Sequence, residues 1–381
     1  MNMLWVDLYS DFSCIADACP NTCCAGWGIT IDNNTYRKMS DNENKLGVPV
    51  QDWICREEDA YKVKLQSDGR CPMLNENNLC KVVLALGPSY LSTICTTYPR
   101  INRQYGSIVE GYLTLACPEV IARLMSKEGL DFDYSENDTP APPYEYGRLY
   151  LYEYAVRTDI IDLLYNFQEF ALSTRLYISF KIIDEAISHC TSNVPDYNVV
   201  KKYIENYYAE GMMKSLNSSL RNIVDESQRY HFLQSIVNIY QDIGFLECYK
   251  RYSKLVEQAR NYFCQNDFEQ YSRDVSLFRN AIKSYHNFYT NYWVYRIFSE
   301  LIEIPDYAKV KEKFIFIGVE FCLIQALALT SFVQNQALDK DEYIYIISSI
   351  SRMEHSSCQK FMEELHKNNL ISAAGLLLLI I

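Results

Sequence analysis

The chain has 381 residues, of which 49% are hydrophobic and 22% are charged, so its composition is that of a folded protein rather than a disordered or fibrous one. The 48 acidic and 36 basic side chains give a net charge of −12, which argues against a nucleic-acid-binding protein, since that class needs a basic surface to displace counterions from phosphates. The length predicts two domains or one large domain, whose core would not need disulfides.

The first ten residues, MNMLWVDLYS, lack the basic segment and the continuous apolar segment of a secretory signal, which predicts a cytoplasmic protein. The chain has 14 cysteines, and nine of them fall within the first 117 residues. In a reducing compartment, thiols clustered in this way are more often metal ligands or redox groups than disulfides. We therefore predict that residues 1–130 form a cysteine-rich, metal-binding domain of short helices and loops.

The densest part of this region reads CIADACPNTCCAGW from residue 14, which spaces four cysteines as C-x4-C-x3-C-C. Such crowding of thiols is typical of a soft divalent metal or an iron–sulfur cluster. Two later cysteines are followed directly by proline, a context also found beside cluster ligands. Cys55 has no such setting and is interpreted as a spare thiol. The predicted ligands are Cys14, Cys19, Cys23, Cys24, Cys71, Cys80, Cys95 and Cys117.

Two absences favour iron–sulfur chemistry over zinc. The chain has no C-x2-C pair, and its first histidine is His189, so a site in the first region must be built from thiolate or oxygen ligands. Eight thiolates allow one four-iron cluster and another metal, two clusters, or one cluster with structural cysteines left over. The C-x3-C-x2-C triad of radical S-adenosylmethionine enzymes is absent as well, so that chemistry is not indicated.

Beyond the cysteines, the segment DFDYSENDTPAPP from residue 131 contains four acidic residues and three prolines, and cannot continue a helix. We predict an acidic and proline-rich linker at residues 131–145, followed by an all-helical domain at residues 146–381. The predicted fold is therefore mostly α, with the cysteine-rich region packed on a multi-helix domain.

Apolar residues at steps of three and four predict the helices of the second domain. One such series runs through Leu277, Ala281, Tyr285 and Phe288. The longest apolar stretch, residues 315–333, has Glu320 and Gln325 near its middle, which favours a buried core helix over a membrane span. The other predicted helices lie at 172–187, 199–216, 245–263, 289–302, 307–333 and 342–366.

The sequence resembles the flagellin lysine N-methylase family. In the first region the resemblance is carried by FSCIADACPNTCCAGWGITID from residue 12, CPMLNENNLC from residue 71, LGPSYLSTICTTYPR from residue 86 and LACPE from residue 115. In the second region it is carried more weakly by HNFYTNYWVYRIF from residue 286 and SRMEHS from residue 351. The first four blocks occur in order within about 125 residues, which makes the match specific.

The resemblance implies transfer of a methyl group from S-adenosylmethionine to lysine side chains of flagellin by a protein that holds a [4Fe-4S] cluster. The glycine-rich turn of a Rossmann methyltransferase is absent, so S-adenosylmethionine would be bound in an unrelated way. The alternative is a non-enzymatic module that binds an iron–sulfur cluster or zinc and serves in electron transfer or interaction with a partner protein.

The candidate catalytic residues adjoin the resembling blocks. Glu119 and Glu354 are candidates for the base that deprotonates the lysine, although both could be solvated surface carboxylates. His355 is a candidate for contact with the substrate or a cofactor, and a core or helix-end histidine is the alternative interpretation.

Four further residues are candidates for binding the methyl donor, namely Tyr98, Arg100, Asn291 and Arg296. Arg100 could bind the carboxylate of the donor or could brace the cysteine loops. Asn291 and Arg296 have helical spacing, and a network of caps and salt bridges would explain them as well.

Overall fold

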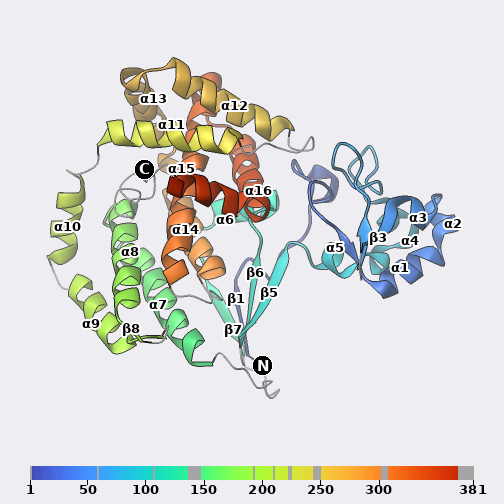
Figure 1. Cartoon of the computed structure of the whole chain (residues 1–381), viewed down its shortest axis with the longest axis horizontal. Coiled ribbons are helices and arrows are strands. Elements are labelled where there is room, and N and C mark those ends of the chain that lie inside the picture. Colours follow the sequence, from blue (N-terminus) through green and yellow to red (C-terminus); the bar gives the residue numbers. More distant parts are fainter. Residues whose placement is uncertain are drawn as a thin grey trace.

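The computed structural model describes residues 2–57, 60–105, 108–135, 147–191, 194–208, 211–221, 225–242, 250–301 and 308–367. Figure 1 shows a large helical body, a sheet at its edge, and a smaller lobe that projects to one side. The prediction of a mostly α fold is confirmed. The strands that accompany the helices were not predicted.

The smaller lobe, hereafter the cysteine lobe, is built from short elements between residues 14 and 98. Its strands form an antiparallel sheet in the order β2-β4-β3. Its separate small core contains Met39, Val50 and Trp53. The elements are η1 (Ala16–Ala18), β2 (Thr30–Ile31), α1 (Asn33–Ser40), α2 (Glu43–Leu46), α3 (Val50–Trp53), β3 (Ile54–Glu57), β4 (Ala60–Val63), α4 (Lys81–Leu86), η2 (Pro88–Tyr90) and α5 (Thr93–Thr97).

The larger sheet joins residues from both ends of the first 135 positions. Its order is β5-β6-β1-β7, in which β5 and β6 form a hairpin, β1 runs parallel to β6, and β7 runs antiparallel to β1. The four strands are β1 (Asn2–Val6), β5 (Arg100–Tyr105), β6 (Ile108–Leu113) and β7 (Phe132–Ser135), and α6 (Pro118–Ser126) lies between β6 and β7 in the chain.

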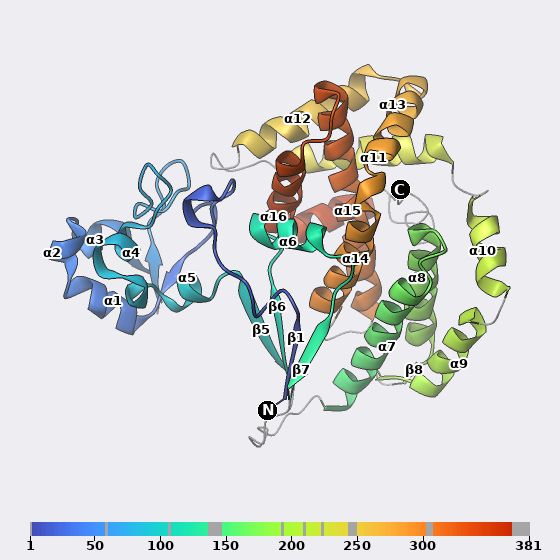
Figure 2. The ribbon, with the colours of Figure 1, turned by 180° about the vertical axis from the view of Figure 1, so that it is seen from behind.

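The helical body contains the longest helices of the protein. As Figure 2 shows from behind, α14 and α15 lie in its middle, α12, α13 and α11 cover one end, and α16 lies beside α15 and α6. A short pair of strands, β8 (Cys190–Thr191) and β9 (Val194–Pro195), follows α8. The helices are α7 (Gly147–Asn166), α8 (Leu172–Ser188), α9 (Tyr197–Tyr208), α10 (Met212–Arg221), α11 (Glu226–Asp242), α12 (Lys250–Gln265), α13 (Phe268–Ala281), η4 (Lys283–Tyr285), α14 (His286–Glu300), α15 (Ala308–Asn335) and α16 (Lys340–Lys367).

Two predicted helices are interrupted. The segment 199–216 forms α9 and α10, which are separated at Gly211, whose φ of +99° a residue with a side chain rarely adopts. The series from Leu277 to Phe288 is divided by η4, and Leu277 is 59% exposed, so the spacing there did not mark a single buried face. The helix α15 is long and apolar enough to cross a membrane, but its most apolar 18-residue stretch is completely buried within the protein, as predicted for a core helix.

Part of the predicted linker belongs to the larger sheet. Residues Phe132–Ser135, from the predicted linker, form β7 and pair with β1, while residues 136–146 lie outside the described part of the chain. The large core takes in Val6, Leu113 and Val120 together with the helices. The beginning of the chain and the segment from β5 onward therefore belong to the helical body, and only the residues between them form the cysteine lobe.

A buried ion pair joins the large sheet to the helices. Arg157 on α7 contacts the carboxylate of Glu110 on β6 at 2.5 and 2.9 Å, and both side chains are 2% exposed. The Tyr295 hydroxyl on α14 donates to the Leu113 carbonyl oxygen at 2.6 Å and accepts from the Leu113 N–H at 2.8 Å. These contacts fix β6, and with it the segment that leads to Cys117, against the body.

Candidate functional site

Seven of the eight predicted ligands lie in the wall of one pocket of about 460 Å³. The pocket lies where the cysteine lobe meets α6 and α16, and its wall also includes Tyr98, Arg100, Glu119 and Arg352. Cys71 is not in the wall, because it is buried in the small core beside Cys24, Cys80 and Cys95. The seven cysteines of the wall are Cys14, Cys19, Cys23, Cys24, Cys80, Cys95 and Cys117.

Backbone pairing between distant segments brings the thiols together. The Cys71 N–H donates to the Cys24 carbonyl oxygen at 2.8 Å, and an isolated bridge between Leu74 and Cys80 closes the next turn. Ser92 caps α5 and its side chain accepts from the Cys95 N–H. Hydrogen bonds made by the cysteines and by their neighbours in the sequence therefore hold these segments together in one site.

Cys80 and Cys117 each occupy the position immediately before a helix, α4 and α6 respectively. Burial raises the pKa of the Cys117 thiol to about 11, and the backbone N–H groups of Val120 and Glu119 oppose this rise by bonding the sulfur. Burial also raises the pKa of the Cys80 thiol, again against bonds from helix N–H groups. The thiols are therefore held protonated mainly by desolvation, which a bound cation would reverse.

Cys23 and Cys24 form an asymmetric pair. The hydrogen bond between the two thiols raises the pKa of Cys23 and lowers that of Cys24. The Thr22 hydroxyl and the charges of Arg352 and Arg70 lower the pKa of Cys24 further. Cys24 is therefore the member of the pair that is more easily deprotonated.

Cys55, the cysteine that the sequence set apart, lies on β3 outside the pocket wall. Its thiol contacts the Lys62 carbonyl oxygen at 3.6 Å.

The pocket wall fits an iron–sulfur cluster by donor chemistry. Its potential ligands are thiols, no histidine is among the described residues that line it, and the cations Arg100 and Arg352 lie in the same wall. Within the described ranges, no group of three or more His, Cys, Asp or Glu side chains is arranged as a ready metal site. Binding a cluster would therefore require the cysteine segments to draw their thiols together.

Arg352, on α16, is a site residue that the sequence reasoning missed. It donates to the Asn21 carbonyl and side-chain oxygens at 2.8 and 2.9 Å, to the Thr22 carbonyl oxygen at 2.9 Å and to the Ala116 carbonyl oxygen at 3.1 Å. The signal available was its place in the SRMEHS block, two positions before the chosen Glu354.

Tyr98 and Arg100, two of the candidates for binding the methyl donor, lie in the pocket wall. The Arg100 guanidinium donates to the Phe12 carbonyl oxygen at 2.9 Å and stands over the rings of Tyr9 and Phe12 at 5.6 and 5.5 Å. Arg100 therefore braces the segment before Cys14. Burial raises the pKa of the Tyr98 hydroxyl, and its ring lies 5.6 Å from that of Trp27.

Glu119 also lines the pocket, but its carboxylate is engaged. Arg123 donates to it at 2.8 Å, and a second nitrogen of Arg123 donates to the Asp11 carbonyl oxygen at 2.8 Å. To accept a proton from a substrate amine, this Glu119 oxygen would have to give up its contact with Arg123.

The other candidates lie elsewhere. Asn291 is fully buried on α14, where it accepts from the Tyr165 hydroxyl at 3.0 Å and donates to the Lys127 carbonyl oxygen at 2.9 Å. Arg296 forms a buried ion pair with Glu320 at 2.6 Å. Neither lines the pocket, and these contacts are the structural network that the sequence left open. Glu354 and His355 fall on α16, but their side chains lie outside the described part.

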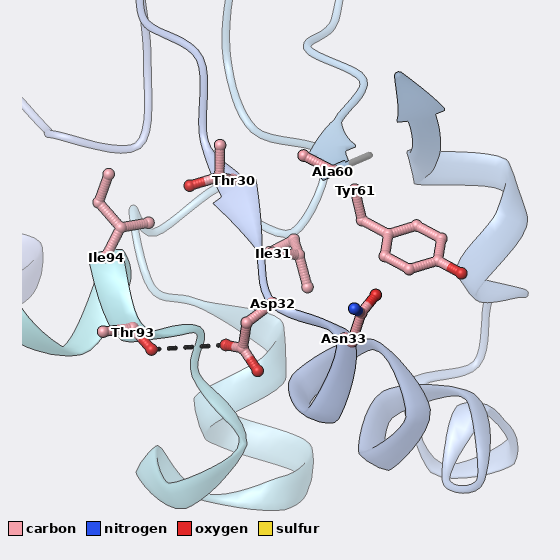
Figure 3. Close-up of a pocket in the computed structure, with 8 residues that line it drawn as sticks. All are labelled: Thr30, Ile31, Asp32, Asn33, Ala60, Tyr61, Thr93 and Ile94. Carbon is pink, nitrogen blue, oxygen red and sulfur yellow. Dashed lines mark hydrogen bonds between the residues drawn. The ribbon is translucent and has the colours of Figure 1, made fainter. Parts of the chain in front are cut away.

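A second pocket of about 290 Å³ lies in the cysteine lobe beside β2 and β4 (Figure 3). The Asp32 carboxylate in its wall caps α1 by accepting from the Thr35 N–H at 2.9 Å and the Thr35 hydroxyl at 2.7 Å, and it lies 3.5 Å from the Thr93 hydroxyl. No cysteine is among the described residues that line this pocket, and the hydrogen bonds of Asp32 are those of a helix cap.

Comparisons with known proteins place the helical body in a family. Residues 157–379, more than half of the chain, match the model of the FliB lysine N-methylase C-terminal domain. That range runs from within α7 through α16 and so includes Arg352.

Individual relatives agree with the family model. A lysine-N-methylase of Salmonella typhimurium and one of Salmonella choleraesuis are each 37% identical over 121 residues, which is 30% of this chain and 30% of each relative. Flagellar biosynthetic protein FliU of Salmonella muenchen shows 37% identity over 121 residues, which is 72% of its length. No solved structure matches. The alignment spans only about a third of the two named methylases, but the family model and the FliU match together show that the chain belongs to the FliB lysine N-methylase family.

Proposed function

We propose that this protein is a protein-lysine N-methyltransferase that acts on flagellin and uses S-adenosylmethionine as the methyl donor. Membership of the lysine N-methylase family supports the reaction, and the name of the FliU relative supports a flagellar substrate. We take the pocket as the site of this reaction, because its wall combines the cysteine segments with Arg352 of the family's helical domain.

Methyl transfer requires a neutral amine, because the lone pair of the lysine nitrogen must attack the methyl carbon. A free lysine has a pKa of about 10.4 and is mostly protonated near neutral pH. The proposed pocket would favour the neutral form, since Phe12, Leu79 and Leu91 contribute apolar surface to its wall and burial penalises the ammonium ion. The cations Arg100 and Arg352 in the same wall act in the same direction.

Glu119 and Tyr98 carry the acidic oxygens among the described residues of the pocket wall. Glu119 lies in the wall but is paired with Arg123, and the Tyr98 hydroxyl is a weak base while it holds its proton. Release of the amine proton to water is compatible with both observations. Most of the rate would then come from alignment of the amine with the methyl group.

We further propose that thiols of the pocket wall hold a [4Fe-4S] cluster. When bound, an iron with an open coordination position would supply a Lewis-acidic site for the amino and carboxylate groups of the methyl donor. The residues that would hold the cluster come from Cys14, Cys19, Cys23, Cys24, Cys80, Cys95 and Cys117, since these line the pocket. Arg100 would keep the segment before Cys14 in place through the Phe12 carbonyl oxygen.

The proposed donor site differs from that of Rossmann methyltransferases. In the described ranges, the largest sheet has four strands and a single parallel pair, β1 with β6. A Rossmann site needs a parallel sheet with a glycine-rich turn at the start of a helix. The donor would therefore be bound by the pocket side chains rather than by a glycine-rich loop.

The decisive experiment uses the full-length protein purified without oxygen. Its iron, acid-labile sulfide and zinc are measured, the protein is incubated with S-adenosylmethionine and flagellin, and the flagellin is weighed by mass spectrometry. We expect iron with sulfide, and mass increments of whole methyl groups on lysine. Zinc alone, with no methyl increments, would overturn the proposal in favour of a metal-binding module.

A matched pair of serine variants tests the site within the same experiment. Cys117→Ser removes a thiol from the pocket wall and should lower the iron content and methylation together. Cys55→Ser removes a thiol outside the wall and should leave both unchanged. Equal losses in the two variants would separate the activity from the pocket.

A further inference from the structure

Arg352 connects parts of the chain that are far apart in sequence. It lies on α16, 331 residues from Asn21 and 236 residues from Ala116, yet its guanidinium donates to the carbonyl oxygens of both. Because these bonds join the family's helical domain to the cysteine segments, Arg352 is a direct link between the two parts of the pocket.

The bonds of Arg352 hold two cysteine segments at a fixed separation. The Thr22 carbonyl oxygen, which it binds at 2.9 Å, immediately precedes Cys23, and the Ala116 carbonyl oxygen, at 3.1 Å, immediately precedes Cys117. A guanidinium is planar and presents its donors in a rigid fork, so a single side chain sets the distance between the two carbonyls. A lysine at this position could not reproduce that geometry.

Asn21 makes further hydrogen bonds between the cysteine segment and α16. Its side-chain amide donates to the hydroxyls of Ser348 and Ser349 on α16 at 3.2 Å each, while its oxygen accepts from Arg352 at 2.9 Å. Both serines are fully buried. Asn21, in the turn between Cys19 and Cys23, therefore donates hydrogen bonds to two serines of α16 and accepts others from Arg352 of the same helix.

The charge of Arg352 has no carboxylate partner within the described ranges. Its four acceptors among the described residues are three backbone carbonyls and the uncharged side chain of Asn21. The charged and ionisable groups that share its pocket wall are Arg100, Glu119, Tyr98 and the seven thiols, and Glu119 is already paired with Arg123. A half-buried cation among neutral acceptors is stabilised by an anion placed beside it.

We propose that Arg352 is a positioning residue, which fixes the segments of Cys23 and Cys117 relative to each other and places a positive charge beside an anionic sulfur group in the pocket. The positioning role stands on the hydrogen bonds alone. The charge role rests on the proposed function, because it needs the sulfur-ligated cluster to be present.

Hydrogen–deuterium exchange on the metal-free full-length protein tests the positioning role. In Arg352→Gln and in Arg352→Lys, the amides of residues 19–24 and 114–118 should exchange about tenfold faster, because each variant loses charge-assisted bonds that hold these segments. Arg279→Gln removes a partly exposed arginine that pairs with Glu226, far from the pocket, and should leave these amides unchanged. Unchanged exchange in both Arg352 variants would overturn the proposal.

The midpoint reduction potential of the reconstituted protein tests the charge role. Arg352→Gln should make the potential more negative, because a nearby positive charge favours the reduced state, whereas Arg352→Lys should stay near the unsubstituted protein. A merely structural role predicts the same potential for Gln and Lys, and that result would overturn the charge role. If the protein takes up no cluster, both the charge role and the proposed cofactor are overturned. The positioning role is then still decided by hydrogen–deuterium exchange on the metal-free protein.

Asn21→Ala provides a second route if the Arg352 variants do not fold. It breaks the bonds to Ser348 and Ser349 but keeps the cation. We expect faster exchange at residues 19–24 with an unchanged potential. Slow exchange in this variant would contradict the link between the turn and α16.

Discussion

The cysteine lobe and the helical body are stabilised in different ways. The body has one large core in which α14 and α15 are buried almost throughout, whereas the lobe has a separate small core beneath short helices and two- to four-residue strands. Burial of apolar area therefore dominates in the body, while turns, helix caps and any bound metal carry more of the stability of the lobe. The pocket lies where the two meet, so its geometry depends on both.

The largest expected difference between the two regions concerns the reactivity of their thiols. Burial raises the pKa of Cys322 on α15 to about 12, whereas the bond from Cys23 lowers the pKa of Cys24 in the lobe. Because the thiolate is the reactive form, alkylation of metal-free protein at pH 7 should modify Cys24 roughly a thousandfold faster than Cys322. Peptide mass spectrometry over time checks this. Equal rates would show that the body opens as readily as the lobe.

A cavity in the body should cost the most free energy of unfolding. Trp293 on α14 is fully buried, with ring contacts to Phe314 at 5.5 Å and Phe321 at 6.0 Å. Trp293→Ala should lower the free energy of unfolding by about 3–5 kcal/mol, measured by urea denaturation and circular dichroism. The exposed Leu277→Ala serves as the control and should stay within about 0.5 kcal/mol. A small effect at Trp293 would mean that the body repacks easily.

Breaking the ion pair between the sheet and α7 should have the next largest effect. Glu110→Gln leaves Arg157 buried without its counter-charge and should cost about 3 kcal/mol in the same urea experiment. Adding Arg157→Met removes the isolated charge and should restore part of the loss. No recovery in the double variant would indicate that the hydrogen bonds of this pair, rather than its charges, hold the sheet.

The smallest expected effect lies in the lobe. Asp32→Ala removes the cap of α1 and should speed amide exchange at residues 33–40 about fivefold, corresponding to the usual loss of about 1 kcal/mol for a cap. Bonds from Thr35 lower the pKa of Asp32, so its stabilisation is fully present above the unfolded-state pKa of about 3.9 and disappears as the pH falls through the lower folded-state pKa.

The matched control for this prediction is Asp32→Asn, which keeps an acceptor for the Thr35 N–H and should retain most of the protection of α1. The unsubstituted protein and Asp32→Ala should converge in exchange at acid pH, below the folded-state pKa of Asp32. A difference that persists there would assign the effect of the substitution to packing rather than to the carboxylate.

Some features of the protein were determined by its sequence alone. The spacing of apolar residues predicted α8, α12 and the buried α15, because a helix repeats its buried face every three to four residues. The cysteine spacing selected eight thiols, seven of which share one pocket, and it set Cys55 apart. The resemblance of the cysteine blocks predicted the family that the comparisons later showed.

Other features were decided only by the tertiary structure. The strand β7 pairs with β1 across more than 120 residues, and local sequence signals cannot specify such a partner. The sequence could not decide whether Asn291 and Arg296 bind the methyl donor or belong to a structural network. The tertiary structure shows hydrogen bonds of Asn291 to Tyr165 and Lys127, and an ion pair of Arg296 with Glu320. Arg352 entered the site because folding brings α16 against residues 21–22 and 116, a contact that depends on three-dimensional proximity and leaves no periodic signal in the chain.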